Sequence, residues 1–293
     1  MDIRNIKEPS PIVNNGEYLE KIFELQSELL TGYMGKIEKN LPPFPIDIQT
    51  SEGQIILKDF TSRIIEEIAE GYESTENALN LVKSYGYNMS NITNLIDMEM
   101  ILSYLQNSNE EQVDALAFFI DLLLYANIDC KDIYTYCMKT NIFKVKYNNV
   151  CSLHHLMVIG YNTILSKGFN LPLLNNLFPL VNEDMCRDCG KDYTEVISYI
   201  PAFIHSSEEL HNLEDHMLWL VTYHLNISRN YLKNKPWKQS QELTDLNKYY
   251  EQIVLAFIYY MGYLKIMGFN EVTLYNLYWR KNRINYFRQK SGY

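Results

Sequence analysis

The chain has 293 residues, a net charge of −10 and a pI near 5.2. That length allows a full hydrophobic core in one large or two modest domains, while the acidic balance argues against non-specific nucleic-acid binding, which depends on Lys and Arg at phosphates. Five cysteines, no leader after Met1 and a longest uncharged apolar run of only Ile253 to Leu264 predict a cytoplasmic protein without disulfides or a membrane span. We therefore expect neither nucleic acid nor a membrane as a partner.

The first part of the chain predicts two helices separated by a proline-rich connection. Residues 17–36 have an amphipathic pattern, and residues 41–53 contain prolines that a helix could not cross. Residues 55–72 form the next predicted helix, in which apolar residues recur at helical spacing. This helix carries three glutamates, Glu66, Glu67 and Glu70. The last two are spaced i, i+3, so their carboxylates lie on one face of the helix.

A second acidic helix is predicted at residues 109–127, after one or two short helices within residues 74–106 that break near residues 84–88. Its acids, Glu111 and Asp114, are again spaced i, i+3 and precede an apolar run. Two facing acidic pairs would repel each other unless a cation lay between them, and oxygen ligands of this kind suit Mg²⁺ or Mn²⁺. The candidate metal ligands are Glu67, Glu70, Glu111 and Asp114. The alternative is two solvated helix faces, but the apolar stripes beside the acids indicate core helices.

Residues 129–240 predict a helical insertion that contains a second candidate metal site. One CxxC pair and one CxxH pair could together form a Cys₃His zinc site, with the ligands Cys186, Cys189, Cys151 and His154. The pair at Cys151 begins an apolar helical run, whereas zinc ligands usually lie in tight turns. We therefore favour cysteines as small core residues over zinc ligands.

Two long helices are predicted at the end of the chain, over residues 243–267 and 270–290. One face of the second helix gathers Tyr278, Lys281, Asn285 and Arg288. Arg can bind phosphate oxygens in a bidentate manner, Lys adds a point charge, and Asn can donate to a phosphate or to a base edge. We interpret this face as a phosphate-binding surface. The alternative, a basic helix end that complements the helix dipole, does not require Asn on that face.

These motifs resemble those of the all-α nucleoside triphosphate pyrophosphohydrolases, the superfamily of MazG and the dimeric dUTPases. Glu66-Glu67-x-x-Glu70 and Glu111-x-x-Asp114 are similar to the EExxE and ExxD motifs of that superfamily. The helix after the second motif resembles the DALHF helix of the dimeric dUTPases, with Ala117 in place of His. The end of the chain, with Lys281-Asn282, Asn285 and Arg288-Gln289 in that order, resembles the closing motif of the same branch. Leu25-Gln26-Ser27-Glu28-Leu29 resembles its opening helix.

The resemblance implies an all-α helical bundle with a catalytic core in residues 1–128 and 241–293 and a helical insertion at residues 129–240. It implies Mg²⁺-dependent cleavage of a deoxynucleoside triphosphate, dUTP in the first place, to the monophosphate and pyrophosphate. The implied catalytic residues are Glu66, Glu67, Glu70, Glu111 and Asp114. The implied substrate contacts are Gln26, Tyr278, Lys281, Asn282, Asn285 and Arg288. The alternatives are a dCTP or broader dNTP pyrophosphatase, or a non-catalytic helical interaction protein on the same scaffold.

The resemblance also implies a homodimer, because related proteins complete the site across a two-fold interface. The apolar surface of Ile253 to Met267 exceeds what one helix face needs, so we expect the dimer to form through that helix. The alternative is a monomer in which the insertion replaces the second subunit. Some members of the family are encoded by phages, and for such a member the location would be the host cytoplasm.

Overall fold

The computed structural model describes residues 17–33, 41–86, 91–140, 153–165, 208–232 and 245–291. Within these ranges every regular element is an α-helix, which confirms the predicted all-α class. The helices are α1 (Tyr18–Tyr33), α2 (Ser51–Ser84), α3 (Leu95–Tyr125), α4 (Cys130–Thr140), α5 (Leu153–Leu165), α7 (Glu208–Tyr231), α8 (Leu246–Ile266) and α9 (Glu271–Ser291).

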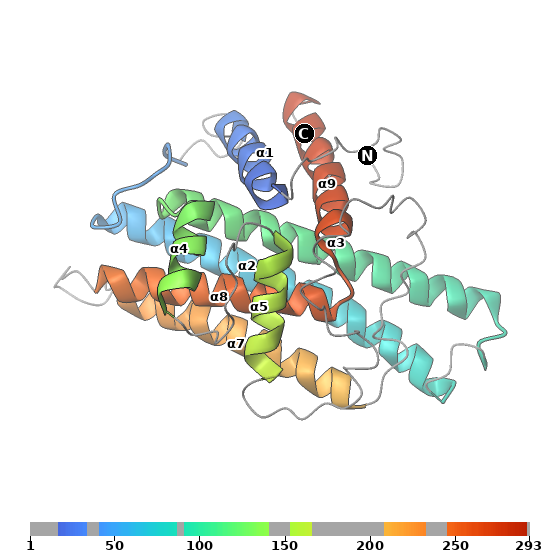
Figure 1. Cartoon of the computed structure of the whole chain (residues 1–293). Helices are drawn as coiled ribbons and strands as arrows, with labels where there is room; N and C mark the ends of the chain where they lie inside the picture. The colour runs from blue at the N-terminus through green and yellow to red at the C-terminus, as the bar shows by residue number, and fades with distance from the viewer. Residues whose placement is uncertain are drawn as a thin grey trace.

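Two antiparallel pairs of long helices form the body of the molecule (Figure 1). One pair is α2 with α3 and the other is α7 with α8, while α5 crosses α8. The first and last helices, α1 and α9, pack against each other and against α3. Segments from opposite ends of the chain thus meet over the middle of α3.

Local side chains set where the helices begin and end. The Thr50 side chain accepts a hydrogen bond from the Gly53 amide at 3.0 Å and caps α2, while Asn94 caps α3 by accepting from the Ile96 amide at 3.0 Å. At the end of α2, Gly86 takes a φ of 69°, a left-handed conformation that glycine adopts without steric cost. The predicted break near residues 84–88 is therefore confirmed.

The predicted helices at 55–72 and 109–127 are parts of longer ones, so the expectation of separate short helices within 74–106 is wrong. Residues 74–84 continue α2 and residues 95–106 begin α3. Gly71 does not end α2, although glycine lowers helix stability by about 1 kcal/mol relative to alanine. A Cβ at Gly71 would lie 2.3 Å from the Gln112 Nε2 atom, so this glycine lets α2 approach α3 closely.

The helix α8 is buried along almost its whole length by α5 and α7. Gly160 of α5 and Gly262 of α8 form the crossing point, where a Cβ on Gly160 would lie 2.2 Å from the Ile258 carbonyl oxygen. The apolar surface of α8 is consequently covered within the chain. The homodimer stays a prediction, and a dimer through α8 would need surface of this helix that α5 and α7 leave uncovered.

The helices between residues 129 and 240 share one hydrophobic core with the remainder of the bundle. Ile133 of α4, Leu156 of α5 and Met217 of α7 belong to the same cluster of buried side chains as Phe119 of α3 and Phe257 of α8. Among the described helices, none is by itself long and apolar enough to cross a bilayer, and α8 with α9 reaches that length and apolarity only across a bend of 104°.

Candidate metal centre and adjoining pocket

Three of the predicted metal ligands come together between α2 and α3. Carboxylate oxygens of Glu67, Glu111 and Asp114 lie within 4.8 Å of one another, and all three residues are half-buried. We call these residues the acidic cluster. Because α2 and α3 are in close contact at Gly71, one turn of each helix can direct its acids into the same small volume.

Burial and mutual repulsion shift the titration of the acidic cluster. Desolvation, followed by the charges of Asp114, Glu111 and Glu70, raises the pKa of Glu67 to about 8. Desolvation also raises the pKa of Glu111 and of Asp114, although the Lys281 ammonium opposes both shifts. Groups in this state are stabilised in the ionised form by a nearby cation. Oxygen ligands from two rigid helices fit Mg²⁺ or Mn²⁺.

The other two predicted acids lie outside the acidic cluster. Glu66 and Glu70 are exposed on α2. Glu70 is near enough for its charge to raise the pKa of Glu67 and Glu111, so it adds negative potential to the site. A role for Glu70 as a ligand, or for Glu66 in orienting water, stays a prediction.

Lys281 of α9 contacts the acidic cluster directly. Its Nζ atom lies 2.7 Å from Asp114 Oδ2 and 4.0 Å from Glu110 Oε2, and the Lys281 side chain is only 15% exposed. Burial lowers the pKa of this lysine, but the charges of Asp114, Glu110 and Glu111 outweigh burial and the pKa is raised. Lys281 is therefore a counter-ion of the acidic cluster. The spacing of residues along α9 alone did not predict this contact with α3.

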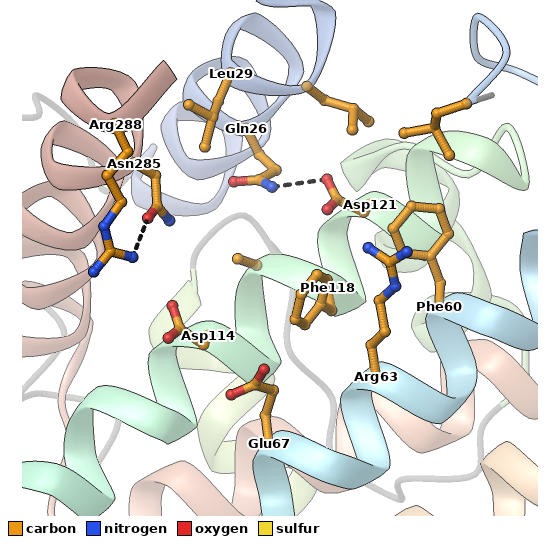
Figure 2. Close-up of a pocket in the computed structure, with 13 residues that line it drawn as sticks. Gln26, Leu29, Phe60, Arg63, Glu67, Asp114, Phe118, Asp121, Asn285 and Arg288 are labelled. Atoms are coloured by element: carbon orange, nitrogen blue, oxygen red, sulfur yellow. Dashed lines mark hydrogen bonds between the residues drawn. The ribbon is translucent and has the colours of Figure 1, made fainter. Parts of the chain in front are cut away.

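A cavity of about 340 Å³ opens beside the acidic cluster (Figure 2). Its walls come from α1, α2, α3, α9 and the connection before α2. The lining residues are Gln26, Leu29, Leu30, Leu41, Phe60, Arg63, Glu67, Asp114, Ala117, Phe118, Asp121, Asn285 and Arg288. Two of the predicted phosphate contacts, Asn285 and Arg288, thus face the same space as two carboxylates of the cluster, and Arg288 Nη1 lies 3.5 Å from Asn285 Oδ1.

The remaining predicted substrate contacts form a buried network. The Tyr278 hydroxyl donates to Gln26 Oε1 at 2.6 Å, and Gln26 Nε2 donates to Asp121 Oδ1 at 2.7 Å. Asn282 is also buried, and its Nδ2 donates to the Leu25 carbonyl oxygen at 3.2 Å. Gln26 and Asp121 line the cavity, whereas Tyr278 and Asn282 hold α9 against α1. Tyr278 and Asn282 therefore affect the cavity by fixing the position of α9, which forms part of its wall.

Several residues of the cavity wall were not predicted from the sequence. Asp121 lies within an apolar stretch, directly after Ile120 and before Leu122, and Arg63 precedes the EExxE segment. The Arg63 guanidinium carbon lies 5.3 Å from the Phe60 ring centroid and 5.6 Å from that of Phe118. The spacing of Arg63 and Glu67, i, i+4 on α2, was the signal that could have identified the arginine.

The proposed zinc ligands cannot be assembled from the described part of the chain. Cys151, Cys186 and Cys189 lie outside the described residues. His154 is half-buried on α5, where burial and the neighbouring Lys265 and His155 lower its pKa to about 4. A neutral histidine in an apolar setting is an ordinary core residue.

Comparison of the chain with models of known protein families, with curated proteins and with solved structures finds no match. The geometry of the cavity and of the acidic cluster therefore carries the functional argument.

Proposed function

We propose that this chain is a Mg²⁺-dependent deoxynucleoside triphosphate pyrophosphohydrolase that resembles the dimeric dUTPases and cleaves dUTP to dUMP and pyrophosphate. One observation carries the proposal. The acidic cluster borders a cavity whose walls also present Arg288 and Asn285, so the site has carboxylates for a metal and donors for an anion in one space. A substrate that is both polyanionic and metal-bound fits that combination.

The acids of α2 and α3 would hold the metal. Glu67, Glu111 and Asp114 offer three carboxylate ligands, and Glu70 lies near enough to add charge. When bound, Mg²⁺ or Mn²⁺ would polarise the phosphates and lower the pKa of a water molecule for attack. Binding of the metal to Asp114 would weaken the ion pair between Asp114 and Lys281, because the metal and the ammonium would share one carboxylate.

The basic residues of α9 would neutralise the phosphates. Arg288 faces the cavity and can contact two phosphate oxygens at once, while Asn285 beside it can donate a further hydrogen bond. Lys281 does not line the cavity and contacts Asp114, so we expect it to act on the phosphates from the side of the acidic cluster. Charge that develops on the phosphates during cleavage would be stabilised by these fixed donors.

The bond between Lys281 and Asp114 also favours a second candidate function. A lysine of the same chain offsets part of the negative charge of the acidic cluster without a metal, which suits a helical interaction protein with an idle site. The two candidates differ in whether divalent metal binds and whether a triphosphate is cleaved.

A dNTP panel with matched variants tests the proposal. The purified chain is incubated with each dNTP and Mg²⁺, and release of pyrophosphate and of monophosphate is followed. Glu111→Gln should abolish turnover, while Glu99→Gln, the same change at an exposed position of α3, should not. Equal activity of the two variants, or no turnover of any dNTP by the unaltered chain, would rule out the proposed activity.

A further inference from the structure

Tyr260 of α8 contacts α3 beside the turn that carries two acids of the cluster. Its hydroxyl donates to the backbone carbonyl oxygen of Gln112 and lies 3.2 Å from Gln112 Oε1, and its ring stacks on Phe119 with the centroids 4.9 Å apart. Asp114 lies between these two contacts along α3. Tyr260 therefore holds α3 on both sides of a predicted metal ligand, although Tyr260 itself does not line the cavity.

The side chain of Gln112 extends this contact to α2. Its amide occupies the space that Gly71 leaves open, because a Cβ on Gly71 would lie 2.3 Å from Gln112 Nε2. Gln112 is completely buried, and its Nε2 atom has no hydrogen-bond partner among the described residues, so the Tyr260 hydroxyl orients the amide through Oε1. Gly71 follows Glu67 by one turn of α2. Tyr260 and Gln112 thus contribute to the spacing of α2 and α3 at the acidic cluster.

The Tyr260 hydroxyl remains a hydrogen-bond donor when the acids ionise. Burial, followed by the negative charges of Asp114 and Glu67, raises the pKa of Tyr260 well above its ordinary value. The contact with Gln112 is therefore present in both the protonated and the ionised state of the acidic cluster.

Contacts with α5 and α7 fix the position of α8 near Tyr260. Two residues further along α8, Gly262 packs so closely on α5 that its Cβ would lie 2.5 Å from the Gly160 carbonyl carbon. One turn after Tyr260, the Tyr263 hydroxyl lies 3.4 Å from Glu214 Oε1 of α7. No described residue of α5 or α7 lines the cavity. These two helices can therefore influence the acidic cluster through α8.

We propose that Tyr260 is a positioning residue of the metal site, which fixes α3 so that Glu111 and Asp114 stay directed at Glu67 before a metal binds. Hydrogen bonds behind metal ligands restrict the orientation of those ligands, and their loss costs about 10- to 100-fold in metal affinity or activity. Here the hydrogen bond is made to the helix that carries the ligands, so one tyrosine acts on two acids at once. The inference rests on the proposed function, because it assumes that the acidic cluster binds the metal.

Mn²⁺ binding in the absence of nucleotide, measured by electron paramagnetic resonance, tests the inference. Tyr260→Phe removes only the hydroxyl and should weaken Mn²⁺ binding by about 10-fold or more. Tyr249→Phe is the matched control, because Tyr249 is also buried in α8 but its hydroxyl has no hydrogen-bond partner among the described residues. This control should bind Mn²⁺ as the unaltered chain does. Circular dichroism verifies that both variants are folded.

Steady-state kinetics separate positioning of the metal site from a general structural role. For the dNTP that the unaltered chain cleaves fastest, Tyr260→Phe should raise the Mg²⁺ concentration for half-maximal activity by about 10-fold. The KM for the nucleotide at saturating Mg²⁺ should stay unchanged, because Asn285 and Arg288 are not altered. A variant that was merely less stable would lose activity without a change in its metal requirement.

The outcomes distinguish failure of this inference from failure of the proposed function. Unchanged Mn²⁺ affinity in folded Tyr260→Phe, or an equal loss in Tyr249→Phe, would overturn the inference and leave the proposed activity standing. If Tyr260→Phe does not fold, Gln112→Met decides, because it removes the Oε1 acceptor and keeps the backbone carbonyl. It should weaken Mn²⁺ binding by about 3-fold, and unchanged affinity would overturn the inference. No Mn²⁺ binding and no dNTP hydrolysis by the unaltered chain would overturn the proposed function, and the inference with it.

Discussion

Replacing Glu67 by Gln should stabilise the metal-free protein at alkaline pH. The folded state raises the pKa of Glu67 from 4.5 to about 8, so between these values the folded chain binds more protons than the unfolded chain. Stability from this group is therefore fully present below about pH 4.5 and is lost as the pH rises through 8. The full difference corresponds to about 5 kcal/mol, at about 1.4 kcal/mol for each pH unit. Glu67 is only half-buried and solvent screens its neighbours, so we expect about 1 to 2 kcal/mol.

Urea unfolding of metal-free protein at pH 5 and at pH 8.5 measures this effect. Glu67→Gln should match the unaltered chain at pH 5 and exceed it by about 1 to 2 kcal/mol at pH 8.5. The neighbouring Glu66→Gln is the matched control, because Glu66 is exposed on the same helix. Adding Mg²⁺ at about 100 times its dissociation constant should stabilise the unaltered chain by about 2.7 kcal/mol and Glu67→Gln by much less. Identical pH dependence in all three proteins would refute the account of the acidic cluster.

Three further predictions follow from the α9 contacts and from the packing of α8. Arg288→Ala should weaken triphosphate binding by about 1.5 to 3 kcal/mol, seen mainly in KM, whereas Lys290→Ala on the same helix should leave KM unchanged. Lys281→Met should tighten Mn²⁺ binding in the absence of nucleotide by about 10-fold, because the substitution removes the ammonium that competes with the metal for Asp114. Electron paramagnetic resonance measures this affinity, and an unchanged affinity would show that the lysine does not compete. Light scattering should give a mass near 34.6 kDa, because α5 and α7 cover α8 within one chain, and twice that mass would show that another surface forms a dimer.

Spacing along single helices predicted the acids but not their partners. The i, i+3 pairs identified Glu67, Glu111 and Asp114, because both members of a pair must share a face whatever the helix packs against. How far each helix is rotated about its axis depends on packing between helices. That rotation brings three acids together and leaves Glu70 exposed. The rotation cannot be predicted from the spacing of residues within α2 alone.

Contacts between distant segments were the part that the sequence left undetermined. Gln26 and Asp121 are 95 residues apart, and Asp121 follows an apolar run in which one acid is easily taken for a surface position. The length of α2 was also underestimated, because a glycine within a helix is easily taken for the end of that helix unless its close neighbour is known. Gly71 is needed for its small size beside Gln112.

The hydrogen bond from Tyr278 to Gln26 joins residues 252 positions apart, and this separation affects the order of events during synthesis. The acidic helices α2 and α3 are made before α9, the helix that carries Lys281 and Arg288. At a synthesis rate of about 5 to 20 residues per second, roughly 10 to 30 seconds pass between synthesis of the acids and synthesis of Lys281. During that interval the nascent chain holds an uncompensated cluster of negative charge and an open apolar wall. The cavity can be completed only once α9 has been made, so a chain that stops short of α9 has no complete pocket.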